Sequence, residues 1–321
     1  MSDSLPSVTV IIAARPEMAE PRALSSARAL DYPADKLEII VARGKQPSVQ
    51  RNAALRAASG ELVYFLDDDS IAQPGNLRRA VEHFRDPEVA IVGGPNLCPP
   101  DAPPLEQVFA LVLGSWLAFG PSRARYLSVG KLRETGEKEL ILCNQLARRE
   151  VMLRHGGFNE ALYPNEENAL MDDIQKAGGK LLYYPELFVY RRPRRTLQAF
   201  AKMLMTYGRG RAEQFRVNPT PGSALNFIPP LLLIYLLALP VGVYWLGWLT
   251  LLPLAVYGLL LLLQFIAIVP RGGVPRSVLT MPLIVLTHVL YGFGFWRGLF
   301  TKLKPPDHPS DPSVTLETVA P

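Results

Sequence analysis

Short apolar runs alternate with amphipathic segments along the first two-thirds of the chain. The runs are rich in Val, Ile and Leu, suit strands buried on both faces, and cover residues 7–14, 37–42, 61–66 and 89–94. Helix-like segments lie between and after them, at residues 20–30, 47–59 and 75–85. In the middle segment, Pro47 suits a first turn and Gly60 suits the end of a helix. This alternation predicts an α/β domain with a parallel sheet and right-handed crossovers.

After the fourth apolar run the pattern is less regular. Residues 105–120 are an unusually apolar helix candidate, which suits either a core helix or a helix in a membrane interface. Asn165 is expected to be the N-cap of a helix with acidic residues in its first turn and glycines at its end. The remaining expected elements are a Pro-rich loop at 95–104, a mobile loop at 121–140, helices at 145–158 and 165–179, and a strand pair at 180–192.

The last third of the chain is almost entirely apolar. Three segments have the length of a bilayer-spanning helix, roughly 20 residues, and cover residues 227–249, 250–269 and 277–300. His288 and Arg297 interrupt the third. If the first domain is cytosolic, a third full span places Arg297, Lys302 and Lys304 outside, against the positive-inside rule. Either this segment is re-entrant or interfacial, or the rule is broken; its length favours a span.

The stretch before these segments is basic and amphipathic. Lys and Arg alternate with apolar residues at helical spacing over residues 191–216, which predicts a helix in contact with anionic lipid headgroups. We therefore expect four regions along the chain. They are an α/β domain at 1–190, a basic interfacial connector at 191–222, a transmembrane region at 223–300 and a disordered Pro-rich tail at 301–321.

Composition narrows the choice of partner and compartment. The 321-residue chain is 49% hydrophobic, and its mean hydropathy of +0.12 is high for a wholly soluble enzyme. Its net charge of +5 fits an anionic membrane surface better than nucleic acid. The first residues lack the pattern of a signal peptide, so the first domain is expected in the cytosol. Cys98 and Cys143 have no zinc-binding spacing, and no P-loop, GxGxxG or nucleophile elbow occurs.

Three consecutive carboxylates, Asp67 to Asp69, follow the strand at 61–66. Alternate side chains of a strand share a face, so Asp67 and Asp69 are expected to point together. Asp68 points away and should tolerate replacement better. Two converging carboxylates at the carboxyl end of a parallel strand suit Mg²⁺ or Mn²⁺, which would offset their repulsion. The alternative interpretation is a solvated acidic turn.

The segments "PSVQRNAAL" and "ASGELVYFLDDDS" resemble family 2 inverting glycosyltransferases of the GT-A fold. In that family an Arg-Asn pair precedes a strand that ends in an Asp-x-Asp motif. The resemblance implies a Rossmann-like, mostly parallel sheet flanked by helices, with Mg²⁺ or Mn²⁺ on Asp67 and Asp69. It also places Arg51, Asn52 and Asp68 on the donor side of the site, near the nucleotide.

The match continues through "HGGFNEALYPNEENALMDDIQKAGG". It places Glu166 and Glu167 on the family's catalytic acidic pair, with Glu167 as the base that deprotonates the acceptor hydroxyl. Taken alone, the two residues are better explained as acids that complement the helix dipole. Arg209 and Arg211 fall near the family's diphosphate-binding motif, although its Gln and Trp are absent. Lipid headgroups are the alternative partners of these two arginines.

Two strand ends depart from the family pattern. The first keeps Glu17 but lacks the usual Asn. The second has Arg43 and Lys45 where the family has an Asp that holds the nucleoside. Glu17 is therefore the candidate contact of the nucleoside, and Arg43 or Lys45 the candidate contact of a phosphate.

The chain is most similar to membrane-attached bacterial enzymes of the exopolysaccharide type, over about residues 7–216. The resemblance implies inverting transfer of a sugar from a nucleotide-sugar donor to a lipid-linked polyprenyl acceptor. A site held at a membrane gains effective concentration for such an acceptor. We expect a multi-pass protein of the inner membrane, with the catalytic domain in the cytosol. A polyprenyl-phosphate glycosyl synthase and an inactive transferase-fold scaffold are the alternatives.

Overall fold

The computed structural model describes residues 5–160, 162, 165–217, 219, 221–303 and 314–321. Its chain divides into two compact units. The first comprises Met1–Pro99, Ala124–Arg191 and Lys304–Pro321, and the second comprises Pro100–Arg123 and Arg192–Leu303. Each unit is therefore built from separate stretches of the chain, whereas the domains expected from the sequence are continuous and follow one another in order.

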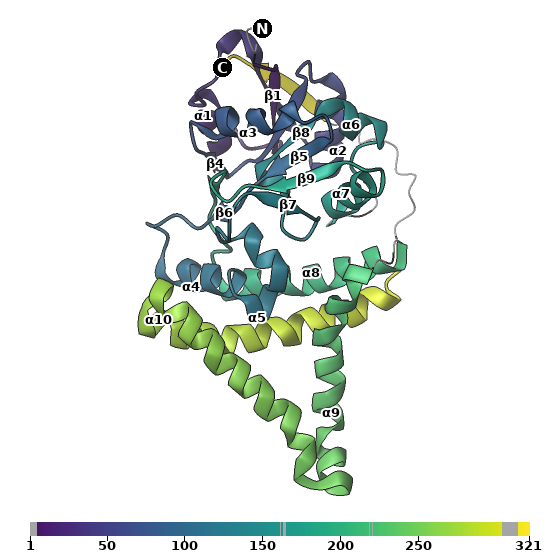
Figure 1. The fold of residues 1–321 in the computed structure, drawn as a ribbon. Coiled ribbons are helices and arrows are strands. Elements are labelled where there is room, and N and C mark those ends of the chain that lie inside the picture. The colour runs from purple at the N-terminus through teal and green to yellow at the C-terminus, as the bar shows by residue number, and fades with distance from the viewer. Residues whose placement is uncertain (1–4, 161, 163–164, 218, 220, 304–313) are drawn as a thin grey trace. The chain divides into compact units, whose positions relative to one another are not determined.

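A sheet of eight strands lies at the centre of the first unit, in the order β11-β2-β1-β3-β8-β5-β9-β7 (Figure 1). The strands are β1 (Val8–Ala14), β2 (Leu37–Arg43), β3 (Leu62–Asp67), β5 (Val89–Gly93), β7 (Arg133–Thr135), β8 (Gln145–Arg148), β9 (Lys180–Tyr183) and β11 (Thr315–Val319). β1 is parallel to β2 and β3, and β5 is parallel to β9. β7, β8 and β11 are antiparallel to their neighbours. The expected α/β class is confirmed, but the sheet is mixed rather than mostly parallel.

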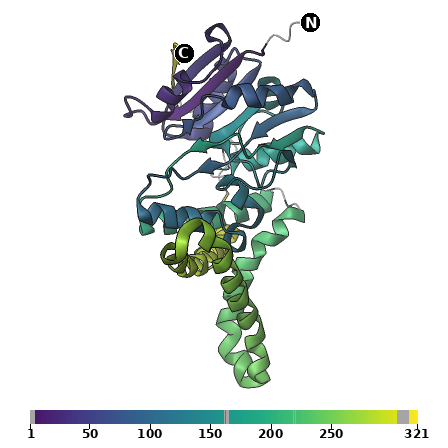
Figure 2. The same cartoon turned by 60° about the vertical axis from the view of Figure 1, so that its left-hand side comes forward.

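Helices cover both faces of this sheet (Figures 1 and 2). They are α1 (Arg22–Arg28), α2 (Pro47–Ala57), α3 (Asn76–Val81), α6 (Arg149–Arg154) and α7 (Glu166–Lys176), with 3-10 turns η1 (Ala34–Lys36), η2 (Glu82–Arg85) and η4 (Leu142–Asn144). Alternate residues of β1 enter different cores. Val10 and Ile12 belong to the same cluster as Leu24 of α1, whereas Ile11 belongs to the cluster that contains Leu55 of α2. The alternation of a central strand thus fixes two hydrophobic layers.

Residues 145–148 form a strand, not the start of the helix predicted at 145–158. β8 lies between β3 and β5, and Leu146 is opposite Tyr64 on one side and Val92 on the other. Leu146 is fully buried. Pairing inside the sheet therefore outweighs the helical propensity of the local sequence. The helix α6 begins only at Arg149.

A second, three-stranded sheet contains one of the strands expected as a pair at 180–192. β10 (Val189–Tyr190) joins β4 (Ile71–Ala72) and β6 (Asn96–Leu97), while β9 belongs to the main sheet. The loop expected to be mobile at 121–140 is likewise more ordered, since it holds most of η3 (Gly120–Arg125) and the strand β7.

The C-terminal residues correct the expectation of a disordered tail. β11 pairs antiparallel with β2, with Glu317 opposite Val41. The carboxylate of Glu317 accepts two hydrogen bonds from the Arg43 guanidinium, at 3.2 and 3.1 Å. Pairing with β11 covers an edge of β2 that would otherwise expose its backbone groups. Residues 304–313 of the expected tail lie outside the described residues.

Helices make up the second unit. They are α4 (Pro104–Leu113), α5 (Trp116–Phe119), α8 (Leu197–Val217), η5 (Pro221–Phe227), α9 (Ile228–Leu246), η6 (Gly247–Leu251) and α10 (Leu252–Phe300). The single helix predicted at 105–120 is therefore broken, because Ser115 caps α5 by accepting a hydrogen bond of 3.0 Å from the backbone N–H of Ala118. The basic amphipathic helix predicted within 191–216 is confirmed as α8.

The helix α10 changes direction at Gly273, whose φ of 67° and ψ of 167° interrupt the helical backbone. After this break it runs beside α8 (Figure 1). The two helices approach closely at Gly208 and Gly294: a Cβ at either glycine would clash with a backbone carbonyl oxygen of the other helix. The segment predicted at 277–300 thus packs along α8.

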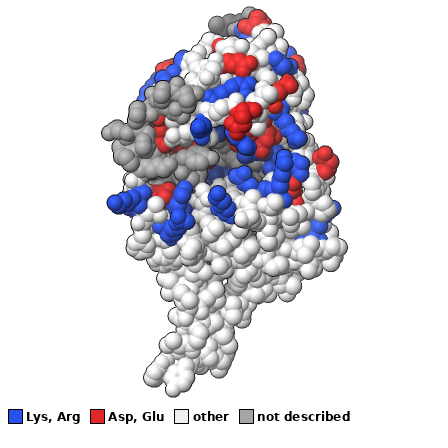
Figure 3. All heavy atoms as spheres, turned by 180° about the vertical axis from the view of Figure 1, so that it is seen from behind, with Lys and Arg blue, Asp and Glu red and all other residues white. Residues whose placement is uncertain are grey.

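By length and composition, the described residues contain one helical stretch able to cross a membrane, Ser223–Phe300, and its most apolar part is largely exposed. It includes α9 and α10. Residues 217–270 carry no Asp, Glu, Lys or Arg, and Figure 3 shows the corresponding uncharged surface. Two or three separate spans therefore remain a prediction.

Candidate functional site

The predicted site residues of the first unit come from the ends of several elements. Asp67 is the last residue of β3, and Asp68 and Asp69 lie in the turn that follows. The backbone N–H of Ser70 closes this turn by donating to the carbonyl oxygen of Asp67 at 3.0 Å. Arg51 comes from α2, and Glu166 is the first residue of α7.

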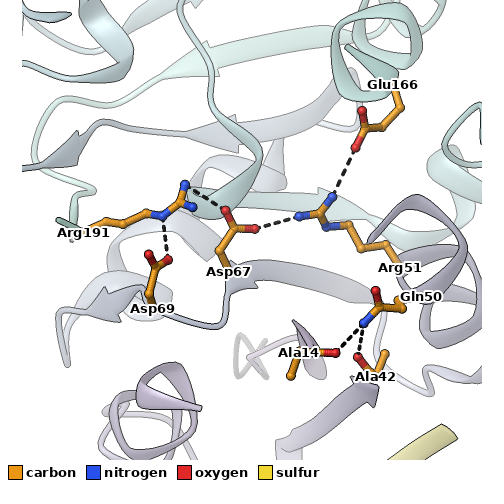
Figure 4. Close-up of polar contacts among 8 residues, drawn as sticks. All are labelled: Ala14, Ala42, Gln50, Arg51, Asp67, Asp69, Glu166 and Arg191. Carbon is orange, nitrogen blue, oxygen red and sulfur yellow. Dashed lines mark hydrogen bonds and ion pairs between the residues drawn. The ribbon is translucent and has the colours of Figure 1, made fainter. Parts of the chain in front are cut away.

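Ion pairs join these side chains into one chain of alternating charge (Figure 4). Arg51 donates to Glu166 Oε1 at 3.3 Å and to Asp67 Oδ1 at 2.7 Å. Arg191, directly after β10, contacts Asp67 Oδ2 at 2.9 Å and Asp69 Oδ1 at 2.6 Å. Asp67 and Asp69 therefore converge on one cationic group, although Asp69 lies in the turn and not in the strand.

Burial and charge act in opposite directions on the pKa values of this chain. Burial lowers the pKa of Arg51, but Asp67 and Glu166 outweigh it, so the net pKa is raised. Arg191 follows the same pattern, because Asp67 and Asp69 raise its pKa well above the ordinary value. Both arginines are therefore firmly cationic.

Glu166 has an unusual pKa for a carboxyl group. Burial and then the neighbouring charge of Glu167 raise its pKa from 4.5 to about 7, against the opposing effect of Arg51. Its Oε2 accepts a hydrogen bond of 3.1 Å from the backbone N–H of Asn165. Glu167 is only partly buried. Of the acidic pair, Glu166 therefore joins the charged chain, and Glu167 is the more accessible carboxylate.

Asn165 occupies the predicted N-cap position, but its side chain does not cap the helix. Its φ of 110° puts it in the left-handed region, which is rare for a residue other than glycine. Its Oδ1 instead accepts a hydrogen bond of 2.8 Å from the side chain of Asn168. The start of α7 is therefore built around a strained residue directly before the acidic pair.

Asp67 and Asp69 suit a divalent metal because carboxylate oxygens are the ligands that Mg²⁺ and Mn²⁺ prefer, and because the two side chains already bind a cationic group. The Arg191 guanidinium bridges one oxygen of Asp67 and one of Asp69, so a cationic group already stands between the two carboxylates. Among the described residues, no group of three or more His, Cys, Asp and Glu side chains gathers to bind a metal. A cation here would complete its oxygen shell with phosphate and water, as Mg²⁺ commonly does.

Asn52 has a structural part in the fold. Its Nδ2 donates to the carbonyl oxygen of Phe158 at 2.8 Å and to Glu160 Oε1 at 2.9 Å, and its Oδ1 accepts from the backbone N–H of Phe158 at 2.8 Å. Asn52 thereby ties α2 to the turn before α7. The neighbouring Gln50 has a similar part, because it donates to the carbonyl oxygens of Ala14 and Ala42 at the ends of β1 and β2.

The other predicted donor contacts have partners or positions of their own. Arg43 is held by Glu317 and donates to the carbonyl oxygen of Ala19 at 3.0 Å. Glu17 and Lys45 are exposed in the loops that follow β1 and β2. Arg209 and Arg211 lie in α8 of the second unit, where Arg209 pairs with Glu213 at 3.4 Å and Arg211 bonds Gln214 at 3.0 Å.

Arg191 is a site residue that the sequence reasoning assigned to lipid headgroups. Its partner Asp69 is 122 positions away in the sequence, so no local pattern reveals the contact. An available signal was its place directly after the strand-like "FVY". The next residue, Arg192, has a different partner: it pairs with the buried Glu106 within the second unit.

A mixed sheet flanked by helices, with an acidic pair at the end of a central strand, fits the GT-A class of glycosyltransferase folds. The family model described as "Glycosyltransferase like family 2" matches residues 2–206. Because this match covers more than half of the chain, the protein belongs to that family.

Similar proteins agree with this assignment. The chain is 29% identical over 179 residues to the pre-mycofactocin glycosyltransferase of two Mycobacterium tuberculosis strains, CDC 1551 / Oshkosh and ATCC 25618 / H37Rv. The match covers 51% of this chain and 34% of each relative, so it spans about a third of their length. Among solved structures, the chain resembles mannosyltransferase PcManGT from Pyrobaculum calidifontis in complex with GDP-Man and Mn²⁺. That likeness, with TM-score 0.57, 19% identity and coverage of 93% and 88% of the two chains, concerns the fold.

Proposed function

We propose that the protein is a membrane-anchored inverting glycosyltransferase that moves a sugar from a nucleotide-sugar to a lipid-linked saccharide in polysaccharide assembly. Membership of the glycosyltransferase family supports sugar transfer. The observation that carries the proposal is the convergence of Asp67 and Asp69 on one cationic group at the end of β3. PcManGT, which shares the fold, was solved with GDP-Man and Mn²⁺, and this supports a nucleotide-sugar and a metal.

Asp67 and Asp69 would hold Mg²⁺ or Mn²⁺, which supplies positive charge to the departing nucleoside diphosphate. Glu167 is the base that takes the proton from the acceptor hydroxyl, since it is the more accessible member of the acidic pair. Glu166 acts through Arg51 as a positioning residue. It fixes the guanidinium that in turn orients Asp67.

A single base that activates the acceptor suits direct displacement of the nucleotide, which inverts the sugar carbon. Within the first unit, Glu166 at the start of α7 is joined to Asp67 through Arg51. The proposed base, Glu167, therefore directly follows a residue that is tied to a candidate metal ligand. This arrangement favours one concerted transfer.

The anchor is a pair of spans formed by α9 and the first part of α10. α9 has 19 residues, a length of about 28 Å at the helical rise, close to the hydrocarbon thickness of a bilayer. Its large apolar side chains are exposed: Leu237 is 81% and Trp245 is 75% accessible. Such a continuous apolar surface needs a lipid partner.

The segment after Gly273 is interfacial in this proposal. It packs along α8, and Arg216 of α8 donates to the carbonyl oxygen of Gly298 at 3.1 Å. Its His288 also contacts the backbone of α5, by a bond of 3.0 Å to the carbonyl oxygen of Leu117. With two spans, Arg271, Arg276 and Arg297 all stay on the cytosolic side. The conflict with the positive-inside rule then disappears.

A donor screen with the purified full-length protein tests the function. Nucleotide-sugars are incubated with Mn²⁺ and a membrane lipid extract, and the products are identified by mass spectrometry. The expected result is a lipid-linked saccharide whose mass increases by one sugar, only when metal is present. Nucleotide binding to the same protein is measured with and without Mn²⁺, and no metal-dependent binding of any nucleotide would reject the proposal.

The same screen separates the alternatives. Transfer to polyprenyl phosphate itself would identify a polyprenyl-phosphate glycosyl synthase, and no turnover with any donor would indicate an inactive scaffold. The matched relatives are named for pre-mycofactocin. A product found only in the aqueous phase would therefore replace the lipid acceptor with a soluble one.

A further inference from the structure

Arg191 is the last residue of the first unit before the chain enters the second. It follows β10, reaches the turn after β3, and leaves a quarter of its side chain exposed. Its contacts at 2.9 Å to Asp67 Oδ2 and 2.6 Å to Asp69 Oδ1 are as short as charge-assisted hydrogen bonds become. The contact to Asp69 is made through Nε and the contact to Asp67 through Nη1, so one planar group spans both carboxylates.

The charges around Arg191 explain why a cation is held there. Glu166, Asp67 and Asp69 supply three carboxylates to the cluster, and Arg51 and Arg191 supply two guanidinium groups. Arg51 is only 8% exposed and is bound on both sides. Arg191 contacts Asp67 and Asp69, and a quarter of its side chain is exposed to solvent. Of the two arginines, Arg191 is therefore the one that can leave its carboxylates.

We propose that Arg191 is a resident counter-cation of the site, which competes with the divalent metal for Asp67 and Asp69 until the donor diphosphate arrives. This inference rests on the proposed function. Both oxygens of Asp67 are already held by guanidinium groups, Oδ1 by Arg51 and Oδ2 by Arg191. A metal that binds Asp67 must therefore compete with one of them, and Arg191 is the more exposed of the two. A diphosphate offers the displaced guanidinium a new bidentate anion. Binding of metal and donor should therefore be cooperative.

Titration of the full-length protein with Mn²⁺ tests this competition, with free ion measured by electron paramagnetic resonance. Arg191→Gln should bind Mn²⁺ roughly tenfold more tightly than the wild type without nucleotide, because a repelling charge is gone. The gain in Mn²⁺ affinity on adding GDP or UDP should be smaller in the variant. Arg191→Lys keeps the charge and should stay within about threefold of the wild type.

Arg78→Gln is the matched control, since Arg78 pairs with Asp31 at 2.8 Å on the surface of the same unit. Thermal unfolding confirms that each variant is folded. If Arg191→Gln is not folded, Arg191→Ala is titrated instead, with and without added guanidinium. The added guanidinium should then lower the Mn²⁺ affinity of Arg191→Ala. Unchanged or weaker Mn²⁺ binding without Arg191 overturns the inference and leaves the function intact. No Mn²⁺ binding by any variant, with or without nucleotide, rejects the metal-dependent function itself.

Discussion

Asp68 and Asp69 are neighbours in one turn, yet their surroundings differ. Asp69 accepts a hydrogen bond of 2.6 Å from Arg191. Burial and the charges of Asp69 and Asp67 raise the pKa of Asp68, which is a cost to the ionised carboxyl. Replacing Asp69 removes a candidate metal ligand, whereas replacing Asp68 removes a repelled charge.

We therefore expect Asp69→Asn to lower turnover by about a hundredfold or more, because charge stabilisation of the leaving group is lost. Asp68→Asn should keep activity within about threefold and leave stability unchanged or slightly higher. Initial rates at saturating Mn²⁺ and thermal unfolding check both variants. Equal losses in the two would contradict the assignment of Asp69 as the ligand.

Glu166 gives a pH dependence of stability with a definite sign. Its pKa is about 7 in the folded protein and 4.5 for the ordinary side chain. Between these values the folded state binds more protons than the unfolded state, so the free energy of unfolding falls as pH rises. The loss is at most about 3 kcal/mol for one group.

Glu166→Gln should remove this contribution. The drop in Tm from pH 5 to pH 8 should be smaller in the variant than in the wild type, because Gln does not ionise. Glu150→Gln is the control, since Glu150 is 83% exposed and pairs with Arg154, one turn along the same helix. Parallel Tm profiles of wild type and Glu166→Gln would show that Glu166 does not titrate in this range.

At the scale of elements, β11 supplies the outer neighbour of β2. Removing residues 314–321 should uncover the edge of β2 over residues 39–43, and hydrogen exchange of the amides on that edge should accelerate by about tenfold or more. Glu317→Gln removes only the surface ion pair with Arg43, so its exchange should stay close to wild type. Exchange mass spectrometry of the intact chain measures both. Unchanged β2 protection in the truncated protein would show that β11 does not hold this edge.

The elements also show what the sequence could predict. β1, β2, β3 and α2 were placed within a few residues, because their apolar runs and end signals are local. β8 and β11 were missed because their strand state depends on partners elsewhere: Leu146 on Tyr64, and Glu317 on Val41. The acidic triplet, in contrast, can be recognised from one short segment, because its three carboxylates are consecutive in the sequence.

The candidate site divides in the same way. Asp67 and Asp69 are candidates from sequence because an acidic run at the end of an apolar strand is a local signal, and Glu166 is a candidate through the family resemblance. Arg191 is not, since its neighbours in the sequence are also basic and only the fold distinguishes the one that turns toward Asp69. The sequence favours Arg43 as a phosphate contact because its partner Glu317 is 274 positions away.

At the scale of the whole molecule, the number of spans decides on which side the charged end of α10 lies. If the first unit is cytosolic, as proposed, two spans place the tip at η6 outside and residue 301 in the cytosol. Three spans place both outside. Single cysteines at Trp248, in η6, and at Thr301, directly after α10, therefore distinguish the two topologies. The background for both is Cys98→Ser, with the buried Cys143 retained.

A membrane-impermeant maleimide is applied to intact spheroplasts and, separately, to lysed ones. With two spans, Trp248→Cys reacts in intact spheroplasts and Thr301→Cys reacts only after lysis. Ser59→Cys, exposed in the first unit, marks the cytosolic side. Reaction of Thr301→Cys before lysis would establish a third span, and the packing of α10 along α8 would then have to form inside the bilayer. The charges make that outcome costly, because Arg297 would have to cross the hydrocarbon layer.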